Sequence, residues 1–287
     1  MIRFALPNKG RLADDARELL ERAGLAFDAR GDRALQAALG DDFLALFVRS
    51  RDIPEFLADG AADIGITGLD LIEECGRPLD ELLDLDFAKC RLALAGREDS
   101  GIVSANDVPR DARVATTFPR LAGAYFERQG NPVVIVPVSG AAENAPHLGV
   151  ADFIVDLVST GSTLRMNGLV EIATILVSTA RLVARPGLLD DADVRGRVTE
   201  LVAAIESVLR ARNKRYLMAN VPRDALDLVK QIIPGISGPT IIEVMDGGRF
   251  VAAHAVVDQS EIFRVIAELR AIGGEGILVT RIERLMP

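Results

Sequence analysis

Apolar runs of strand length alternate with helical periods along the first eighty residues. The runs occupy residues 2–6, 43–48 and 63–67, and the helical periods fill residues 12–23 and 53–58. Gly24 ends the first of these helices, and Asp52 is placed to cap the second, which carries Pro54 in its first turn. Gly68 opens a third helix. The order β-α-β-α-β-α predicts a mostly parallel sheet covered by helices.

A second α/β set begins near Arg91. Its strands are predicted over residues 113–116, 132–136 and 152–157, and its helices over residues 119–129 and 141–148. Two β-rich stretches follow, at residues 169–176 and 180–184. A long helix comes next, because one apolar stripe at helical spacing runs from Val194 to Leu209.

From Lys214 the pattern changes to a smaller unit. Strands are predicted over residues 216–221, 240–245, 250–257 and 276–282, and helices over residues 222–232 and 260–271. Gly247 and Gly248 turn the chain between the second and third of these strands. The order β-α-β-β-α-β is that of the ferredoxin-like fold. The whole chain is therefore predicted to be α/β, with two α/β lobes and a small C-terminal module.

The 287 residues include 33 Lys and Arg against 42 Asp and Glu, a formal net charge of −9. A surface this acidic repels a phosphate backbone and excludes a dedicated nucleic-acid binder. Apolar residues make up 49% of the chain, enough for a packed core, yet no run approaches the ~18 apolar residues of a membrane span. The apolar N-terminal stretch is too short for a signal peptide, and Cys75 and Cys90 form no C-x-x-C pair. We therefore expect a cytoplasmic protein with buried, inert thiols.

The most informative stretch is the turn at residues 159–163, Ser-Thr-Gly-Ser-Thr, which follows a buried strand. Gly161 lets the backbone approach an anion closely, and successive amides at a helix start hold a phosphate with the helix dipole behind them. The hydroxyls add uncharged donors, and Asp156, near the end of the strand, suits ribose hydroxyls. The turn therefore indicates a ribose 5-phosphate site. Ordinary helix capping is the alternative, since Ser and Thr are common there.

A second group of candidate binding residues lies at or just after the ends of the three strands of the first lobe. They are Lys9, Gly10, Arg11, Arg49, Thr67 and Asp70. Two cations beside a glycine turn suit a polyphosphate, and a solvated loop is the alternative. Glu143, at the start of the helix predicted over residues 141–148, either caps that helix or faces the phosphate turn.

Together these motifs resemble the ATP phosphoribosyltransferases, the first enzymes of histidine biosynthesis, in their long form. The resemblance runs through Pro7-Asn-Lys-Gly-Arg11, Arg51-Asp-Ile-Pro54, residues 63–70 and residues 113–116. It is closest from Glu143 to Leu164, which follows the family's Glu, Gly, Asp and Ser-Thr-Gly-Ser-Thr-Leu signature. The short form lacks the C-terminal module that residues 214–287 supply here, so the long form is the closer likeness.

The resemblance implies two periplasmic-binding-protein-like α/β lobes with an active-site cleft between them, and a ferredoxin-like regulatory domain. The implied parts are residues 1–90 with 181–212, residues 91–180, and residues 213–287. The implied activity is that of a pentosyltransferase: N1 of the ATP adenine attacks C1 of 5-phosphoribosyl 1-pyrophosphate, and pyrophosphate leaves. Mg²⁺ is implied as the cofactor, held chiefly by the substrate's phosphates, with no dedicated protein ligands assigned.

Residue by residue, the resemblance places phosphoribosyl pyrophosphate at Asp152, Asp156, Ser159, Thr160, Gly161, Ser162 and Thr163. It places ATP or pyrophosphate at Lys9, Gly10, Arg11, Arg49, Thr67 and Asp70, with Glu143 behind the site or beside the metal. It implies inhibition by L-histidine, bound at Asn220, Ile236, Gly238, Thr240 and Gly276, and a homo-oligomer that ranges from dimer to hexamer. Asn220 stands where some members carry an acid, and an amide holds the histidine ammonium less tightly than a carboxylate does.

Two other classes of protein share some of these features. A two-lobe solute-binding or ligand-sensing protein has the same architecture, and fold alone does not separate it from an enzyme. The phosphate turn and the missing export signal argue against that class. A catalytically idle regulatory paralogue is expected to lose the turn at residues 159–163 or the pair Lys9 and Arg11, and both are present.

Overall fold

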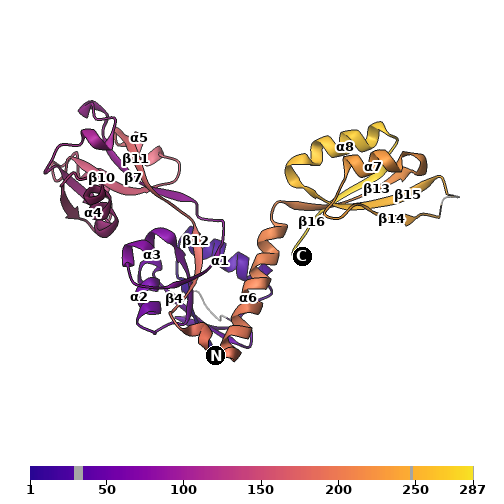
Figure 1. The fold of residues 1–287 in the computed structure, drawn as a ribbon, viewed down its shortest axis with the longest axis horizontal. Helices are drawn as coiled ribbons and strands as arrows, with labels where there is room; N and C mark the ends of the chain where they lie inside the picture. The colour runs from indigo at the N-terminus through magenta and orange to yellow at the C-terminus, as the bar shows by residue number, and fades with distance from the viewer. Residues whose placement is uncertain (29–34, 246–247, 287) are drawn as a thin grey trace. The chain divides into compact units, whose positions relative to one another are not determined.

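The computed structural model describes residues 1–28, 35–245 and 248–286. The chain forms two compact units, Met1–Glu21 with Leu25–Thr199 and Arg22–Gly24 with Glu200–Pro287. The first unit contains two sheets and the second contains one (Figure 1). Helices flank each sheet, so the predicted α/β class is confirmed.

The first sheet has the strand order β2-β3-β4-β1-β5-β12-β6. Its strands are β1 (Ile2–Pro7), β2 (Phe27–Asp28), β3 (Gln36–Leu39), β4 (Phe43–Val48), β5 (Ile64–Gly68), β6 (Asp80–Asp84) and β12 (Ala180–Ala184). Only β1 pairs in parallel, with β4 and with β5; the other described neighbours are antiparallel. The three strands predicted from the sequence, β1, β4 and β5, do run parallel, but the sheet as a whole is mostly antiparallel, contrary to the prediction. A hairpin adds β3 beside β4, and β12 returns from the second sheet against the direction of β5.

Three helices accompany this sheet: α1 (Arg11–Arg22), α2 (Ile53–Ala58) and α3 (Leu69–Cys75). Gly68 precedes α3 as predicted, with an extended backbone. The predicted cap by Asp52 is wrong, since within the described chain its side chain makes no capping hydrogen bond. A short 3-10 turn, Ser50–Asp52, runs directly into α2, so Asp52 already has helical angles (φ −86°, ψ −15°) rather than the extended ones of a capping residue.

The second sheet has the order β11-β7-β10-β8-β9. Its strands are β7 (Cys90–Arg97), β8 (Arg113–Thr116), β9 (Val134–Pro137), β10 (Phe153–Val158) and β11 (Leu169–Ser178), with helices α4 (Pro119–Arg128) and α5 (Ser162–Met166). The helix predicted over residues 141–148 is wrong: only a 3-10 turn, Ala142–Asn144, forms. Pro146 lacks an amide N–H and its ring clashes with a helical backbone, which stops the helix.

Two neighbouring segments connect the sheets of the first unit. Residues 85–89 lead from β6 to β7, and Thr179 alone leads from β11 back to β12. The first segment hydrogen-bonds Ala180, the residue of β12 that directly follows Thr179: Leu85 N donates to Ala180 O at 3.0 Å, and Ala180 N donates to Phe87 O at 3.0 Å. The two segments therefore form a paired crossing rather than two independent loops.

The long helix predicted from the apolar stripe is α6 (Ala192–Ala211), and it continues from the first unit into the second. Val198, Leu201, Ile205 and Val208 are buried along it. They lie at the spacing of one helical face, which confirms the predicted stripe.

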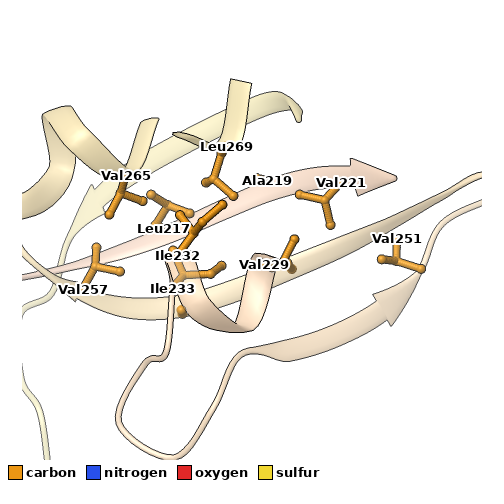
Figure 2. Close-up of a cluster of buried hydrophobic side chains, with 12 residues drawn as sticks. Leu217, Ala219, Val221, Val229, Ile232, Ile233, Val251, Val257, Val265 and Leu269 are labelled. Atoms are coloured by element: carbon orange, nitrogen blue, oxygen red, sulfur yellow. The ribbon is translucent and has the colours of Figure 1, made fainter. Parts of the chain in front are cut away.

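The second unit contains a four-stranded antiparallel sheet of order β14-β15-β13-β16. Its elements are β13 (Lys214–Pro222), α7 (Leu226–Ile232), β14 (Thr240–Glu243), β15 (Phe250–Asp258), α8 (Ile262–Ala271) and β16 (Glu275–Arg281). Figure 2 shows Val229 of α7 and Leu269 of α8 packing over the sheet among residues such as Leu217. The predicted ferredoxin-like order is confirmed.

One predicted helix of this unit begins later than expected, and one predicted turn lies partly outside the described residues. The helix predicted to begin at Pro222 begins at Leu226, because Pro222 ends β13 and a 3-10 turn, Arg223–Ala225, precedes the helix. The turn predicted at Gly247 and Gly248 falls partly on Gly247, which lies outside the described residues. Across the part of the chain that the structure describes, no helix has the length and apolarity needed to cross a membrane.

Candidate active site

The turn after β10 forms the floor of a small pocket. The pocket has a volume of about 170 Å³ and is lined by Glu143 and by residues 156–164. Gly161 has a φ of +74°, a left-handed angle that glycine adopts without strain. The hydroxyls of Thr160 and Ser162 lie 3.0 Å apart. Two hydroxyls of the turn thus lie together in the pocket lining, and the Ser162 amide donates to the Thr160 hydroxyl oxygen at 3.4 Å. The helix that follows, α5, has five residues, so the turn itself carries the site more than a helix dipole does.

Asp156 and Glu143 are two carboxylates in the wall of this pocket. Burial raises the pKa of Asp156 and the charge of Glu143 raises it further, while the amide of Leu157, which donates to Asp156 Oδ1 at 2.8 Å, acts in the opposite direction. Asp156 therefore accepts a proton more readily than an ordinary aspartate. Its position at the end of β10 suits the hydroxyls of a sugar whose phosphate sits in the turn.

Two arginines hold the carbonyl groups of the turn. Arg91 lies opposite Val158 in the β7–β10 pairing and donates from Nη1 to the Ser159 carbonyl oxygen at 3.1 Å. Arg165 donates from Nη1 to the Thr160 carbonyl oxygen at 3.4 Å. Sequence reasoning missed both. Arg165 lies four residues after Gly161, a spacing that could have indicated it, whereas the contact of Arg91 depends on a strand pairing that the sequence does not display.

The structure does not bring Asp152 into the pocket. It precedes β10, and at about 3.3 Å per residue it lies about 13 Å along the strand from Asp156. There its carboxylate accepts a hydrogen bond from the Arg113 amide at 2.8 Å, and its own amide donates to the Arg113 carbonyl. Asp152 therefore joins the start of β10 to β8 and lies at the far end of the strand from the turn.

The predicted cations lie together at the carboxyl edge of the first sheet. Pro7 of β1 pairs with Val48 of β4, and the two following segments carry Lys9, Arg11 and Arg49, all exposed. Gly10 has a φ of +83° and its carbonyl accepts the amides of Ala13 and Asp14, so it also opens α1. The arrangement places three exposed positive side chains at one sheet edge, a pattern that suits a polyphosphate.

Thr67 and Asp70 reach the same sheet edge but are buried. Thr67 donates its hydroxyl to the Ser50 carbonyl at 3.0 Å and is fully covered. Asp70, 5% exposed, accepts the Ser178 hydroxyl at 2.5 Å, and its amide donates to that same hydroxyl oxygen at 3.1 Å. Burial raises the pKa of Asp70, and the bond from Ser178 opposes this. Both residues hold the segments around the site, with their polar groups already occupied.

A hydrogen bond links the two carboxyl edges. Arg51, in the segment after β4, donates from Nη2 to the carbonyl of Thr117, which follows β8, at 3.1 Å. Because β8 and β10 are parallel neighbours, Thr117 lies at the same sheet edge as the phosphate turn. The polar ends of the two sheets of the first unit are therefore connected.

The predicted effector residues fall on the sheet and one turn of the second unit. A side-chain carbon added at Gly276 would lie 3.3 Å from Asn220 Nδ2, so these two residues adjoin. Thr240 pairs with His254 on the same sheet. Ile236, 68% exposed, and Gly238, with a φ of +103°, lie in the turn before β14. Asn220 and Gly276, which are far apart in the sequence, are thus brought into direct proximity.

The donor groups fit a magnesium ion that is shared with substrate. Within the described residues, no three His, Cys, Asp or Glu side chains gather into a metal site. Asp156 and Glu143 nevertheless place two carboxylates beside the pocket. Mg²⁺ is commonly bound by one or two carboxylates together with substrate phosphates, so these residues suit it without forming a protein-only cage.

Comparisons with known proteins follow the same division of the chain. The family described as ATP phosphoribosyltransferase (HisG) matches residues 49–207, and the HisG C-terminal domain matches residues 211–284. ATP phosphoribosyltransferase of Gemmatimonas aurantiaca is 56% identical over 292 residues, and that of Methanocaldococcus jannaschii is 45% identical over 288, each over the full length of both chains.

A solved structure matches much of the chain. It is the ATP phosphoribosyl transferase (HisG:HisZ) complex from Thermotoga maritima, 31% identical, with a TM-score of 0.63 over 72% of this chain and 99% of that one. A family match over more than half of the chain and full-length relatives at 45–56% identity show that the chain belongs to the ATP phosphoribosyltransferase family, in its long form.

Proposed function

We propose that this chain is an ATP phosphoribosyltransferase that joins N1 of the ATP adenine to C1 of 5-phosphoribosyl 1-pyrophosphate and releases pyrophosphate. The observation that supports this proposal best is the pocket after β10, where turn amides and hydroxyls lie beside the carboxylate of Asp156. A sugar phosphate needs both features at once. The reaction is the first step of histidine biosynthesis.

The chain's residues have mainly positioning and electrostatic roles in this reaction. The turn at residues 159–163 holds the 5-phosphate, and Asp156 accepts hydrogen bonds from the ribose hydroxyls. Lys9, Arg11 and Arg49 balance the charge of ATP and of the leaving pyrophosphate, which favours departure from C1. No protein nucleophile is needed, because the adenine nitrogen attacks and alignment of the two substrates lowers the barrier.

Asp156 and Glu143 are the residues that would hold Mg²⁺ against the diphosphate. When bound, the ion neutralises charge on the leaving pyrophosphate. Glu143 has a second effect of its own, since its charge keeps the pKa of Asp156 high in the absence of a cation.

L-histidine is the inhibitor that we propose for the second unit, and a homo-oligomer between dimer and hexamer is the proposed assembly. The adjoining Asn220 and Gly276 support a binding site for a small polar ligand on this sheet. The proposed location is the cytoplasm, in keeping with the free thiols of Cys75 and Cys90.

The test is formation of phosphoribosyl-ATP, followed by its ultraviolet absorbance, from ATP, phosphoribosyl pyrophosphate and Mg²⁺, with and without histidine. Asp156→Ala should lower kcat/KM by at least roughly tenfold, because it removes a charged hydrogen-bond acceptor from the sugar. Its melting temperature should stay close to that of the wild type. Unchanged kinetics would remove Asp156 from the site, and no product from the wild type would contradict the proposed function itself.

A further inference from the structure

An ion pair between Arg91 and Glu171 contacts the turn at residues 159–163 through the Ser159 carbonyl group. Arg91 forms a two-pronged contact with Glu171: its Nε lies 2.8 Å from Oε1, and its Nη2 lies 2.5 Å from Oε2. The remaining nitrogen, Nη1, reaches the Ser159 carbonyl oxygen at 3.1 Å. Thr174 donates its hydroxyl to Glu171 Oε1 at 3.0 Å. Arg91 therefore has one group committed to the turn and two committed to Glu171, which is itself held on β11.

Holding a carbonyl group also orients the amide of the next residue. The peptide unit is planar and trans, so the Ser159 carbonyl and the Thr160 amide point in opposite directions. When Arg91 binds the carbonyl, the Thr160 N–H is directed away from Arg91. Arg165 acts in the same way one residue later, because its bond to the Thr160 carbonyl orients the Gly161 amide.

We propose that Arg91, fixed by Glu171, is a positioning residue that orients the turn amides toward the 5-phosphate of phosphoribosyl pyrophosphate. The inference rests on the proposed function. It adds two residues, Arg91 and Glu171, that lie outside the sequence motifs. The charge of Arg91 is balanced by Glu171, and the two side chains are 33% and 26% exposed. The geometry of the pair, more than its net charge, acts on the anion.

Charge and geometry predict opposite results for Glu171→Gln. The substitution removes a negative charge close to an anion site, so electrostatics alone predicts tighter binding of the phosphate. It also weakens the two-pronged contact that holds Arg91, so positioning predicts weaker binding. The sign of the change in affinity therefore separates the two explanations.

The experiment measures the Kd of ribose 5-phosphate by calorimetry and the KM values of both substrates, in the full-length protein. Arg91→Ala should raise the Kd of ribose 5-phosphate and the KM of phosphoribosyl pyrophosphate roughly tenfold, and Glu171→Gln roughly threefold. The KM of ATP should stay within about twofold for both, a difference that general loss of structure would not produce. Arg91→Lys should resemble Arg91→Ala, because an ammonium group cannot reproduce the fork.

The matched controls are Arg97→Ala and Asp99→Asn. Arg97 stands at the other end of β7 and makes the same kind of two-pronged contact, with Asp99, at 2.9 and 2.5 Å. Both variants should bind ribose 5-phosphate as the wild type does. Glu171→Gln with equal or tighter binding, or full activity in Arg91→Lys, would overturn the positioning role. A wild type that binds ribose 5-phosphate but forms no phosphoribosyl-ATP would contradict the proposed function. The Kd values of the variants would then still test the positioning role of Arg91.

Discussion

The surroundings of Asp156 raise the pKa of its carboxyl group. It is half-buried, and both burial and the nearby Glu143 favour its protonated form. The ionised form accepts hydrogen bonds from ribose hydroxyls on both oxygens, and these bonds are stronger than those to the protonated form. Substrate binding is therefore expected to depend on the protonation state of this one carboxyl group. Burial raises the pH at which that state changes, and Glu143 raises it further.

The acid side of the pH profile tests this relation. In the wild type, kcat/KM for phosphoribosyl pyrophosphate should fall as the pH decreases through the raised pKa of Asp156. Glu143→Gln removes a repulsive charge and lowers that pKa, so the decline should move to lower pH. The measurement is kcat/KM against pH for both proteins. A decline that stays in place, or moves to higher pH, would contradict the coupling of the two acids.

Asp63 gives a prediction about stability. Burial opposes its ionisation, but hydrogen bonds from Arg3 and Arg185 outweigh this and lower the pKa to about 2. A folded-state pKa below the ordinary value stabilises the protein above pH 4 or so, and that contribution disappears as the pH falls toward 2. Asp63→Asn should therefore lower the unfolding free energy by about 2 kcal/mol at neutral pH.

Denaturant unfolding at neutral and at acid pH measures the effect of Asp63→Asn. The difference from the wild type should shrink as the pH falls, since the wild-type carboxylate also becomes protonated. Asp59→Asn is the control, because Asp59 is 64% exposed in its pair with Arg77, and such surface pairs contribute little. An equal loss in both variants would show that the burial of Asp63 has no special role.

At the scale of elements, the site depends on short connections between strands and helices. The segment from β10 to α5 is only Ser159–Gly161 long, and a left-handed residue lies at its end. Gly161 is the residue that makes this turn possible. A side chain there would meet a strained backbone, and its first carbon would lie 3.2 Å from Arg165 Nη1.

Gly161→Ala is therefore predicted to raise the KM of phosphoribosyl pyrophosphate roughly tenfold, because alanine in a left-handed conformation distorts the turn. Gly168→Ala is the matched control: Gly168 also has a positive φ, +56°, but a side-chain carbon there would have no atom within 4 Å. The control should lose stability and keep its KM. Steady-state kinetics measure the KM of both variants, and thermal melts measure their stability. A normal KM in Gly161→Ala would contradict the role of the turn.

Helices and strands could be predicted from the sequence where the hydrophobic periodicity and the turn residues indicated the same boundaries. The ranges of β4, α2, β8 and β12 match the predicted ones residue for residue. β7 was missed because alternating Leu and Ala in Cys90–Arg97 favour a helix as much as a strand. The turn at residues 159–163 was recognised from its local composition. The contact between Arg91 and Ser159 was not, since these two residues are 68 positions apart and meet only through the pairing of β7 with β10.

At the scale of the whole molecule, the second unit has its own hydrophobic core and carries the proposed effector residues. Its buried residues come from β13, β15, α7 and α8, and the sheet is antiparallel throughout. A ligand bound there would act on the first unit by stabilising one arrangement of the chain over another. The strength of inhibition should therefore follow the affinity of this unit for histidine.

Asn220→Asp is predicted to lower the concentration of histidine needed for half inhibition roughly fivefold, because a carboxylate binds an ammonium group more tightly than an amide does. Asn213→Asp, in the exposed turn between α6 and β13, makes the same change of charge away from Gly276 and should have no effect. Inhibition curves at fixed substrate concentrations measure both. Equal sensitivity of Asn220→Asp and the wild type would remove Asn220 from the effector site.

The paired crossing between the two sheets of the first unit has a consequence for the history of the chain. Cys90 and Ser178, the first and last residues of the second sheet, stand directly opposite each other in the β7–β11 ladder. A segment whose ends meet in this way can be inserted into, or removed from, a host fold without separating β6 from β12, which remain bonded to each other. Residues 90–178 therefore have the geometry of an insertion module, and exchange of this module between related enzymes would alter the proposed sugar-phosphate site while the first sheet, which carries the proposed ATP-binding residues, stays intact.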